Sequence, residues 1–355
     1  MMVDPDILVR ALQAIGSNPE SRRRVTEALR DVEPLLAREG LNVREEITGP
    51  LVDALHEGVE SVDVVLAGGL SFSVLYTGKI ARDLAMRRSE RPDHVFEPQT
   101  TKTLLRLARD ARHVVIGGAY SGDHAVLIAA AIAPHGGVVH AFEPNPRQLQ
   151  MLQENARRNG ITNIRAVGLG LWYDESTRLS FVGADELAQT TPSAEGAIEV
   201  TTIDAYCARE GIDRIDLIML DIEGSEHAAL RGAARMLRGD AAPNVVFEIH
   251  GSYVDWSKGL RATPIGSYLA QLGYELYSIR DFQSHVDMAG LPVELVAADD
   301  SYLEGPPHGF NMLATKDAAL LDDPLFDVVS AVSPKLLHHR DPKLHYPAAW
   351  QPARR

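Results

Sequence analysis

The sequence has little of several features that define common protein classes. A single cysteine, Cys207, excludes an internal disulfide and a cysteine-rich zinc site. The 35 Lys and Arg are outnumbered by 49 Asp and Glu, so the basic footprint of a nucleic-acid-binding protein is missing. The longest apolar run, Ala125–Pro134, is far shorter than the roughly 20 residues that cross a bilayer, and no signal peptide is visible. We therefore predict a soluble, cytoplasmic protein that binds neither nucleic acid nor membrane.

The 355 residues are enough for a full α/β domain with an appendage. Residues 4–40 show helical spacing with a break at Ser17-Asn18-Pro19, and a strand-like pair follows near residues 62–76. These features predict a mainly helical N-terminal cap over residues 1–94, which we expect to contribute to a homodimer. A catalytic domain is predicted over residues 95–317, and an irregular tail over residues 318–355.

Strands and helices alternate from residue 113 onward, which predicts a mostly parallel sheet with helices on both faces. The predicted strands are 113–117, 138–143, 164–167, 179–181, 198–203, 216–222, 244–250, 274–279 and 310–315.

The most informative stretch is HVVIGGAYSGDHAVLIAAAIAPHGGVVHAFEP, residues 113–144. It predicts a buried strand, a glycine turn, a helix and a second strand that ends at Glu143. Glycines let a ligand approach the backbone closely, and a carboxylate at this point can accept hydrogen bonds from both hydroxyls of a ribose. An adenosine-containing cofactor is therefore the first hypothesis.

The glycine turn also distinguishes between two cofactors. A dinucleotide fingerprint has the pattern G-x-G-x-x-G, but here Ala119 stands at the middle glycine, which lets the backbone approach a pyrophosphate. S-adenosylmethionine has no phosphate and does not need that glycine. The turn therefore favours S-adenosylmethionine over NAD, although such a turn can also serve only to connect a strand to a helix.

Two further segments place acids at strand ends. In IDLIMLDIEGSEHAALRGA, residues 215–233, a buried strand delivers Asp221 and Glu223 to the edge where ligands of open α/β sheets bind, and Glu223 is expected to organise the loop there. In NVVFEIHGSY, residues 244–253, Glu248 and His250 project from the same face of a strand. Asp221, Glu248 and His250 are predicted as catalytic residues, and the same three could hold Mg²⁺. The sequence leaves open whether they form a metal site or an acid–base network.

These segments together resemble a known family. FEPNPRQLQMLQENARRNG (142–160), TTIDAY (201–206), LDIEGSEHAALRGA (220–233) and VVFEIH (245–250) are similar to the FkbM family of S-adenosylmethionine-dependent methyltransferases. The resemblance covers residues 95–315. It implies a class I methyltransferase, Rossmann-like fold, with a seven-stranded sheet whose last strand is antiparallel. It also implies O-methylation of a sugar or a polyketide or peptide natural product, a role in natural-product or antibiotic biosynthesis.

The resemblance implies that Glu143 holds the ribose and that the glycine turn shapes the methionine side of the pocket. The full set of cofactor residues that it implies is Glu97, Gln99, Thr100, Gly118, Ala119, Tyr120, Gly122, Asp123, Glu143, Pro144, Asn145, Gly170, Leu171 and Asp221.

Three positions depart from the family pattern. Ile116 stands where an Asp is usual in the first strand, Tyr120 replaces an Asn in the glycine turn, and Met219 replaces a Lys before Asp221. Asp123 or the segment around Glu97 is expected to compensate for the lost polar contacts. Two alternatives stay open at this point: an NAD-dependent oxidoreductase acting on a nucleotide sugar, and a non-catalytic binding subunit with the methyltransferase fold.

Overall fold

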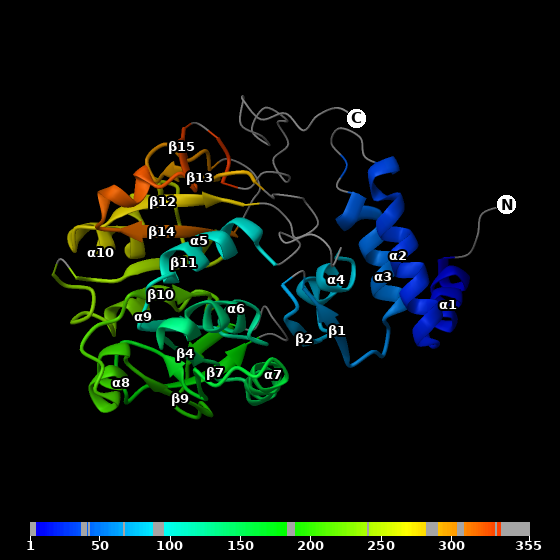
Figure 1. The fold of residues 1–355 in the computed structure, drawn as a ribbon, viewed down its shortest axis with the longest axis horizontal. Helices are drawn as coiled ribbons and strands as arrows, with labels where there is room; N and C mark the ends of the chain where they lie inside the picture. The colour runs from blue at the N-terminus through cyan, green and yellow to red at the C-terminus, as the bar shows by residue number, and fades with distance from the viewer. Residues whose placement is uncertain are drawn as a thin grey trace. The chain divides into compact units, whose positions relative to one another are not determined.

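The computed structural model describes residues 5–36, 41, 43–66, 68–87, 96–182, 189–239, 241–281, 290–303, 309–330 and 332–334. The described residues fold as two units (Figure 1), one formed by those before Glu97 and the other by those from Glu97 onward. Each unit is considered by itself. The predicted tail residues from 335 onward lie outside the described part of the chain.

The first unit is mainly helical, as the sequence predicts. Its two long helices meet at a short break, where the Asn18 side chain accepts a hydrogen bond from the Ser21 amide at 2.9 Å and caps the second helix. The Arg44 guanidinium is buried and ion-paired with Glu33 and Asp83. The elements are α1 (Pro5–Gly16), α2 (Pro19–Leu36), the π-helix η1 (Arg44–Thr48), α3 (Gly49–Leu55), the antiparallel hairpin β1 (Ser61–Val65) and β2 (Ser71–Leu75), and α4 (Lys79–Ala85).

The second unit is built on a sheet of nine strands. Figure 1 shows the order from β15 at the top of the view down to β4. In spatial order the strands are β15 (Phe326–Val329), β13 (Val293–Ala297), β12 (Glu275–Arg280), β14 (Gly309–Thr315), β11 (Asn244–His250), β10 (Leu217–Leu220), β3 (His113–Gly117), β4 (Val138–Phe142) and β5 (Ile164–Val167).

Seven of these strands follow the class I methyltransferase topology that the sequence predicts. Counted along the chain, β3, β4, β5, β10, β11, β12 and β14 are the first to seventh strands, and their spatial order is 3-2-1-4-5-7-6. The seventh strand, β14, pairs antiparallel with both β11 and β12. The four strands β4, β3, β10 and β11 pair in parallel.

The expected count of seven strands is wrong for the sheet as a whole. Strand β13 pairs antiparallel with β12, and β15 pairs in parallel with β13, which extends the sheet at one edge. Strand β15 also falls in the segment predicted as an irregular tail. These two strands are short, and their pairing partners are distant in sequence, so local patterns did not reveal them.

Helices cover the sheet because its strands are apolar on both faces. One face carries a core in which Val115, Ile218 and Phe247 pack with side chains of three helices. These are α8 (Ile203–Glu210), α9 (Glu226–Arg231) and α10 (Pro264–Gln271). The remaining helices of this unit are α5 (Pro98–Ala108), α6 (Asp123–Ile132) and α7 (Pro146–Arg158), together with the 3₁₀ turns η2 (Ala133–His135), η4 (Leu260–Ala262) and η5 (Ala318–Asp322).

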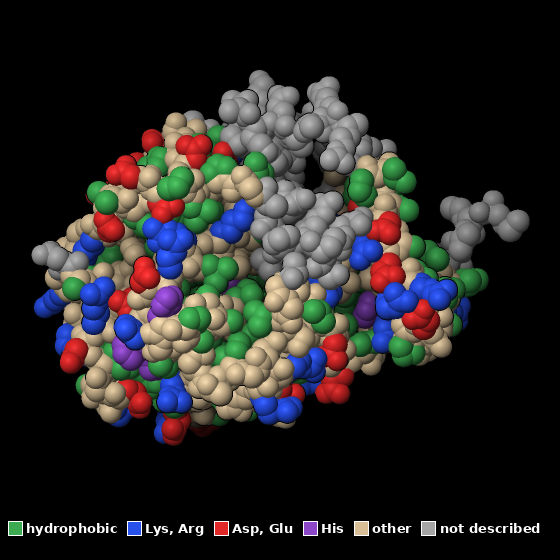
Figure 2. Space-filling view, viewed as in Figure 1, with side chains coloured by type: hydrophobic (Ala, Val, Ile, Leu, Met, Phe, Trp, Pro, Cys, Tyr) green, Lys and Arg blue, Asp and Glu red, His purple; other side chains and the backbone are tan. Residues whose placement is uncertain are grey.

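A small sheet with the order β6-β9-β7-β8 follows the strand β5 in the chain. Its strands are β6 (Gly170–Leu171), β7 (Arg178–Val182), β8 (Gln189–Pro192) and β9 (Ile198–Thr201). Within the described residues, no helix is both long and apolar enough to cross a membrane. The face in Figure 2 carries acidic and basic side chains interspersed over the second unit.

Candidate functional site

The candidate site lies at the carboxyl edge of the central strands. Parallel strands bring their carboxyl ends to one edge, and β4, β3, β10 and β11 are neighbours. The first element there is the glycine turn after β3. The amides of Gly118 and Ala119 both donate to the Phe142 carbonyl at 3.0 Å, which holds the turn against the end of β4.

Glu143 is joined to this turn by its side chain. Its carboxylate accepts the Tyr120 amide at 2.9 Å and the Asn145 amide at 2.8 Å. Burial raises the pKa of Glu143 to about 7, the charge of Asp123 adds to this shift, and the two amide donors oppose it. The structure therefore holds an acid in a fixed position beside the glycine turn, where the sequence placed the ribose ligand.

The backbone is strained around this edge. Among the described non-glycine residues, positive φ angles occur at Glu97 (46°), Tyr120 (44°) and Glu223 (53°). Glu97 comes just before α5, Tyr120 lies in the glycine turn, and Glu223 lies in the loop after β10. Such conformations are costly for residues with a Cβ atom and cluster at functional sites.

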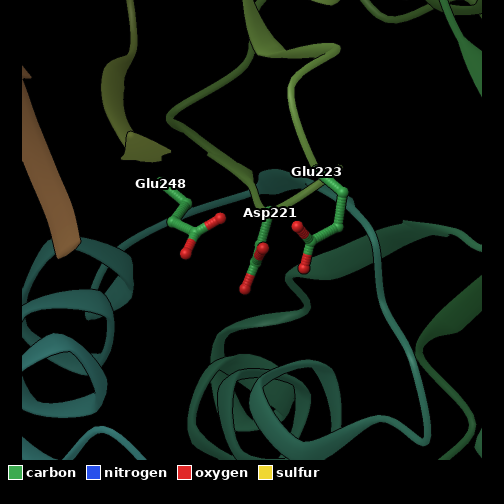
Figure 3. Close-up of side chains that lie close together, drawn as sticks. All are labelled: Asp221, Glu223 and Glu248. Carbon is green, nitrogen blue, oxygen red and sulfur yellow. The ribbon is translucent and has the colours of Figure 1, made fainter. Parts of the chain in front are cut away.

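Three carboxylates converge beside the turn (Figure 3). Asp221 follows β10, Glu248 belongs to β11, and Glu223 comes from the loop after Asp221. One carboxylate oxygen from each lies within 4.8 Å of the others. Such a group of oxygen ligands suits a hard cation such as Mg²⁺.

The acids of this cluster repel one another. Burial, followed by the negative charges of Glu248, Glu97, Glu223 and Glu226, raises the pKa of Asp221 well above its ordinary value. A proton or a bound cation would relieve this repulsion. Asp221 is thus suited to hold a proton or to bind a positive group.

His250 does not belong to the carboxylate group, and Glu223 takes the place that the sequence assigned to it. The Nδ1 atom of His250 accepts the Ser252 amide at 3.0 Å, and its ring lies 5.1 Å from the ring of Tyr253. Tyr253 in turn donates a hydrogen bond to the Glu223 carboxylate. Period-two spacing correctly put Glu248 and His250 on one face of the strand, but the loop conformation brings Glu223 nearer to Asp221.

Glu226 organises the loop instead of facing a ligand. Its carboxylate accepts the Ile222 amide at 2.9 Å and the Gly224 amide at 3.1 Å. Burial raises the pKa of Glu226 to about 7, while these amides oppose the shift. This interaction turns the chain after Asp221 and positions Glu223.

The residues at the start of α5 have two different sets of contacts. The amides of Gln99 and Thr100 donate to Asp281 at 3.0 and 2.8 Å, and the Thr100 hydroxyl donates to it at 2.7 Å. Both residues are fully buried, and Gln99 Nε2 donates to the Pro292 carbonyl. These contacts fasten the start of the helix, and the direct contact of Gln99 and Thr100 with a cofactor stays a prediction.

Glu97 has different neighbours. Its carboxylate accepts a hydrogen bond from Asn311 Nδ2 at 2.6 Å and lies 4.0 Å from His124 Nε2. Its charge also raises the pKa of Asp221, as noted above. Glu97 therefore lies close to the carboxylate cluster, whereas Gln99 and Thr100, which follow Glu97, are held by Asp281.

Sequence reasoning missed His124, Asn311 and Tyr253. The Nε2 atom of His124 and the Oδ1 atom of Asn311 are buried without a hydrogen-bond partner in the structure. His124 lies next to Asp123 at the start of α6, which was a usable signal. Asn311 reaches Glu97 from 214 residues away, and no local pattern could have predicted that contact.

The other predicted cofactor residues are placed as follows. Asp123 and Gly122 begin α6, and Pro144 and Asn145 precede α7, whose first amides the Asn145 side chain caps. Gly170 and Leu171 form the strand β6, and a Cβ atom at Gly117 would lie 2.9 Å from the Leu171 side chain. Leu171 therefore packs against the end of β3.

The sequence pattern of this unit matches a known family. Residues 117–276 match the methyltransferase FkbM domain. This part of the chain is similar to FkbM methyltransferase domains. The family pattern includes Asn155, whose side chain donates to the Ser121 carbonyl at 2.8 Å and so helps to hold the glycine turn.

The solved structures that this chain is similar to are distant in sequence. The FkbM methyltransferase from Methylobacillus flagellatus KT is 20% identical with a TM-score of 0.34, and the match covers 58% of this chain and 43% of that one. A precorrin-6y C5,15-methyltransferase from Geobacter metallireducens GS-15 is 14% identical with a TM-score of 0.35, over 62% and 89% of the two chains.

The O-methyltransferase TomG from Streptomyces achromogenes is 18% identical with a TM-score of 0.30, over 44% and 58% of the two chains. This chain thus spans less than half the length of the Methylobacillus flagellatus structure. No curated protein matches it.

Proposed function

We propose that the second unit binds S-adenosylmethionine and transfers its methyl group to a hydroxyl group of a sugar or natural product. The observation that carries this proposal is the Glu143 carboxylate, which the Tyr120 and Asn145 amides fix beside the glycine turn. An acid at this position suits a ribose, and Ala119 in place of the middle glycine argues against a dinucleotide.

The negative charges at this edge of the sheet complement the positive charges of S-adenosylmethionine. S-adenosylmethionine carries positive charge on its sulfur and its amino group, and the edge of the sheet gathers Asp221, Glu223, Glu248 and Glu97. Ile116, which replaces the usual acid of the first strand, is buried and apolar. Glu97 is the acid that we assign to the cofactor amino group in its place.

When bound, the cofactor supplies an electrophilic methyl group. The chain must orient the acceptor hydroxyl in line with that group and accept its proton. We assign the proton to the Asp221 carboxylate, because its raised pKa makes it a stronger base than an ordinary Asp. Glu248 and Glu223 keep that pKa raised and orient the acceptor, and His250 remains a second candidate base.

A bound Mg²⁺ is the alternative to Asp221 as a free base, because a cation on these carboxylates would lower the pKa that their repulsion raises. The three carboxylates of Asp221, Glu223 and Glu248 offer oxygen ligands, and a divalent cation would offset their repulsion. We expect Mg²⁺ to raise the melting temperature of the wild type and to leave that of Asp221→Asn nearly unchanged. Equal shifts in the two proteins would argue against a metal at this cluster.

Isothermal titration calorimetry tests the cofactor directly. We expect micromolar binding of S-adenosylmethionine and of S-adenosylhomocysteine, and no binding of NAD. Binding of NAD alone would support the oxidoreductase alternative. Binding of none of the three would favour a non-catalytic subunit.

The cytoplasmic location, the homodimer and the absence of a nucleic-acid partner stay predictions.

A further inference from the structure

A buried polar cluster, the Glu97 cluster, lies beside the three converging carboxylates. Three segments that are distant in the chain contribute to it, namely the start of α5, the first turn of α6 and the strand β14. Its members are Glu97, Thr101, His124 and Asn311. Thr101 and His124 are each 6% exposed and Asn311 is 2% exposed. Polar groups buried this far from water are costly unless they have hydrogen-bond partners.

Asn311 and Glu97 connect this cluster to the carboxylates. Asn311 lies directly opposite Glu248 in the antiparallel pairing of β14 with β11, so the two side chains share one face of the sheet. The charge of Glu97 is one of those that raise the pKa of Asp221. The Glu97 cluster and the carboxylates therefore occupy adjoining parts of the same edge of the sheet.

His124 connects the cluster to the glycine turn. It is the second residue of α6, which begins directly after Gly122 at the end of that turn. Its Nε2 atom lies 4.0 Å from the Glu97 carboxylate. Under the proposed function this turn faces the methionine part of S-adenosylmethionine, so the cluster lies on the amino-acid side of the cofactor.

The orientation of the Asn311 amide follows from its partner. A carboxylate accepts hydrogen bonds and does not donate them, so the Asn311 nitrogen is the atom that faces Glu97, at 2.6 Å. The other end of the amide is Oδ1, which is buried, and no described residue donates a hydrogen bond to it. The structure therefore holds a buried acceptor that lacks a donor.

The His124 ring presents a second atom of this kind. The Thr101 hydroxyl lies 3.4 Å from Nδ1, whereas Nε2 is buried with no hydrogen-bond partner among the described residues. The carboxylates of Glu97 at 4.0 Å and Asp123 at 3.9 Å are both too distant from Nε2 for a hydrogen bond. In the neutral tautomer that carries its hydrogen on Nδ1, toward Thr101, Nε2 is an acceptor. Two buried acceptors, Nε2 and the Asn311 Oδ1, thus adjoin the same carboxylate.

A ligand group that satisfies these atoms has to donate hydrogen bonds and carry positive charge. An ammonium has three N–H donors and no acceptor. A hydroxyl has a single donor, and a carboxylate or phosphate has none and would be repelled by the acids at this edge. S-adenosylmethionine carries an α-ammonium at its amino-acid end, which is the end that the glycine turn would face.

We propose that Asn311 and His124 recognise the α-ammonium of the cofactor together with Glu97, and so select a cofactor whose amino-acid end is intact. This inference rests on the proposed S-adenosylmethionine function and names further residues that determine its specificity. Glu97 and Asn311 lie outside the stretch of residues 117–276 that matches the family. They give the ammonium a site although Ile116 replaces the usual acid of the first strand.

Isothermal titration calorimetry on the full chain tests the inference with three ligands. The first is S-adenosylhomocysteine. The second is its deaminated form, which keeps the carboxylate and lacks the ammonium. The third is methylthioadenosine, which lacks the whole amino-acid end. We expect the wild type to bind the first roughly 10- to 100-fold more tightly than the second.

Two substitutions remove the acceptors. Asn311→Leu deletes the amide at nearly constant size, and His124→Phe keeps a ring without nitrogen atoms. Each should weaken S-adenosylhomocysteine binding by about tenfold and leave the affinities for the other two ligands unchanged. Thr315→Val is the matched control, because Thr315 is a buried polar residue of the same strand whose hydroxyl accepts the Asp317 amide, outside the cluster. It should change none of the three affinities.

The ligand series separates the possible failures. Equal wild-type affinity for S-adenosylhomocysteine and its deaminated form would overturn the inference alone, and that comparison needs no variant. A loss that S-adenosylhomocysteine and its deaminated form share in the variants would point to a carboxylate contact and would overturn it too. Unchanged methylthioadenosine affinity shows that a variant is folded, and an equal loss for all three ligands in both variants would mean a structural role instead. A wild type that binds none of the ligands would overturn the proposed function.

Discussion

The backbone of Gly118 lies so close to Asp221 that a Cβ atom at Gly118 would stand 1.7 Å from the Asp221 carbonyl oxygen. The glycine turn after β3 and the first residue after β10 are thus in direct backbone contact. The turn proposed to face the cofactor and the acid proposed to face the acceptor are therefore positioned by one another.

Substitution of Gly118 by Ala should be strongly destabilising. The new Cβ atom would clash with backbone, which cannot move aside as a side chain can, and the φ of 75° adds strain. We expect a loss of about 3 kcal/mol or more in the free energy of unfolding, measured by urea denaturation. Gly211→Ala is the matched control, since Gly211 has a φ of 70° with no neighbour within 4 Å. It should cost about 1 kcal/mol. Equal losses would show that the close contact does not matter.

Cofactor affinity should depend on pH through Glu143. The ribose hydroxyls need an ionised acceptor, and the pKa of the free carboxyl is raised to about 7. The protonated form therefore dominates below pH 7, so the affinity for S-adenosylhomocysteine should fall by up to about tenfold per pH unit below 7. Above pH 7 the affinity should level off. Isothermal titration calorimetry at several pH values between roughly 5 and 8 measures this dependence of affinity on pH. Glu143→Gln should bind weakly with a flat profile, and an unchanged slope in that variant would remove Glu143 from this role.

The ionisation of Glu143, which should favour cofactor binding, should lower the free energy of unfolding of the cofactor-free protein. A carboxyl group whose pKa rises on folding favours the fold while it is protonated. Its contribution is present below the unfolded pKa of 4.5 and is lost as the pH rises through about 7. Bound cofactor should therefore raise the melting temperature more at pH 8 than at pH 6.

Asp221→Asn should make the protein more stable and much less active. The substitution removes a charge that its acidic neighbours repel, so we expect a gain of about 1 kcal/mol in the free energy of unfolding at pH 8. The gain should shrink at low pH, where the wild-type group is protonated as well. Methyl transfer should fall by about 10²–10⁴-fold if Asp221 is the base. Glu199→Gln, at an exposed surface ion pair, should change neither quantity. A less stable Asp221→Asn protein would contradict the repulsion.

Removal of the Asp281 side chain should loosen the start of α5. Asp281→Ala leaves the buried amides of Gln99 and Thr100 without their acceptor, along with the Thr100 hydroxyl. We expect a loss of about 3 kcal/mol in the free energy of unfolding, measured by denaturant. Asp281→Asn keeps one acceptor oxygen and should lose less. Equal and small losses would mean that other groups replace the carboxylate.

Most of the central fold and part of the candidate site could be predicted from the sequence. The β-branched strands, the glycine turn and the acids at strand ends are local patterns, so they predicted the strands and the alternation with helices, while the class I arrangement was implied by the family resemblance. They also placed Glu143, Asp221 and Glu248 at one edge of the sheet.

Features set by long-range contacts could not be predicted in this way. The left-handed φ of Glu97 and its bond to Asn311 depend on a strand 214 residues later in the chain. The presence of Glu223 in place of His250 in the acid cluster depends on the conformation of the loop between β10 and α9, residues 221–225, whose amides the Glu226 carboxylate accepts. Neither has a periodic pattern in the sequence.

The position of β14 has a consequence for how the protein is made. This strand, Gly309–Thr315, lies between β11 and β12, although both of those precede it in the chain. The family match ends at residue 276, before β14 begins. A ribosome releases the two flanking strands long before the strand that joins them, so a gap persists in the middle of the sheet during synthesis. Completion of this sheet must therefore wait until Gly309–Thr315 has emerged, and the edges of β11 and β12 that face β14 stay unpaired until then.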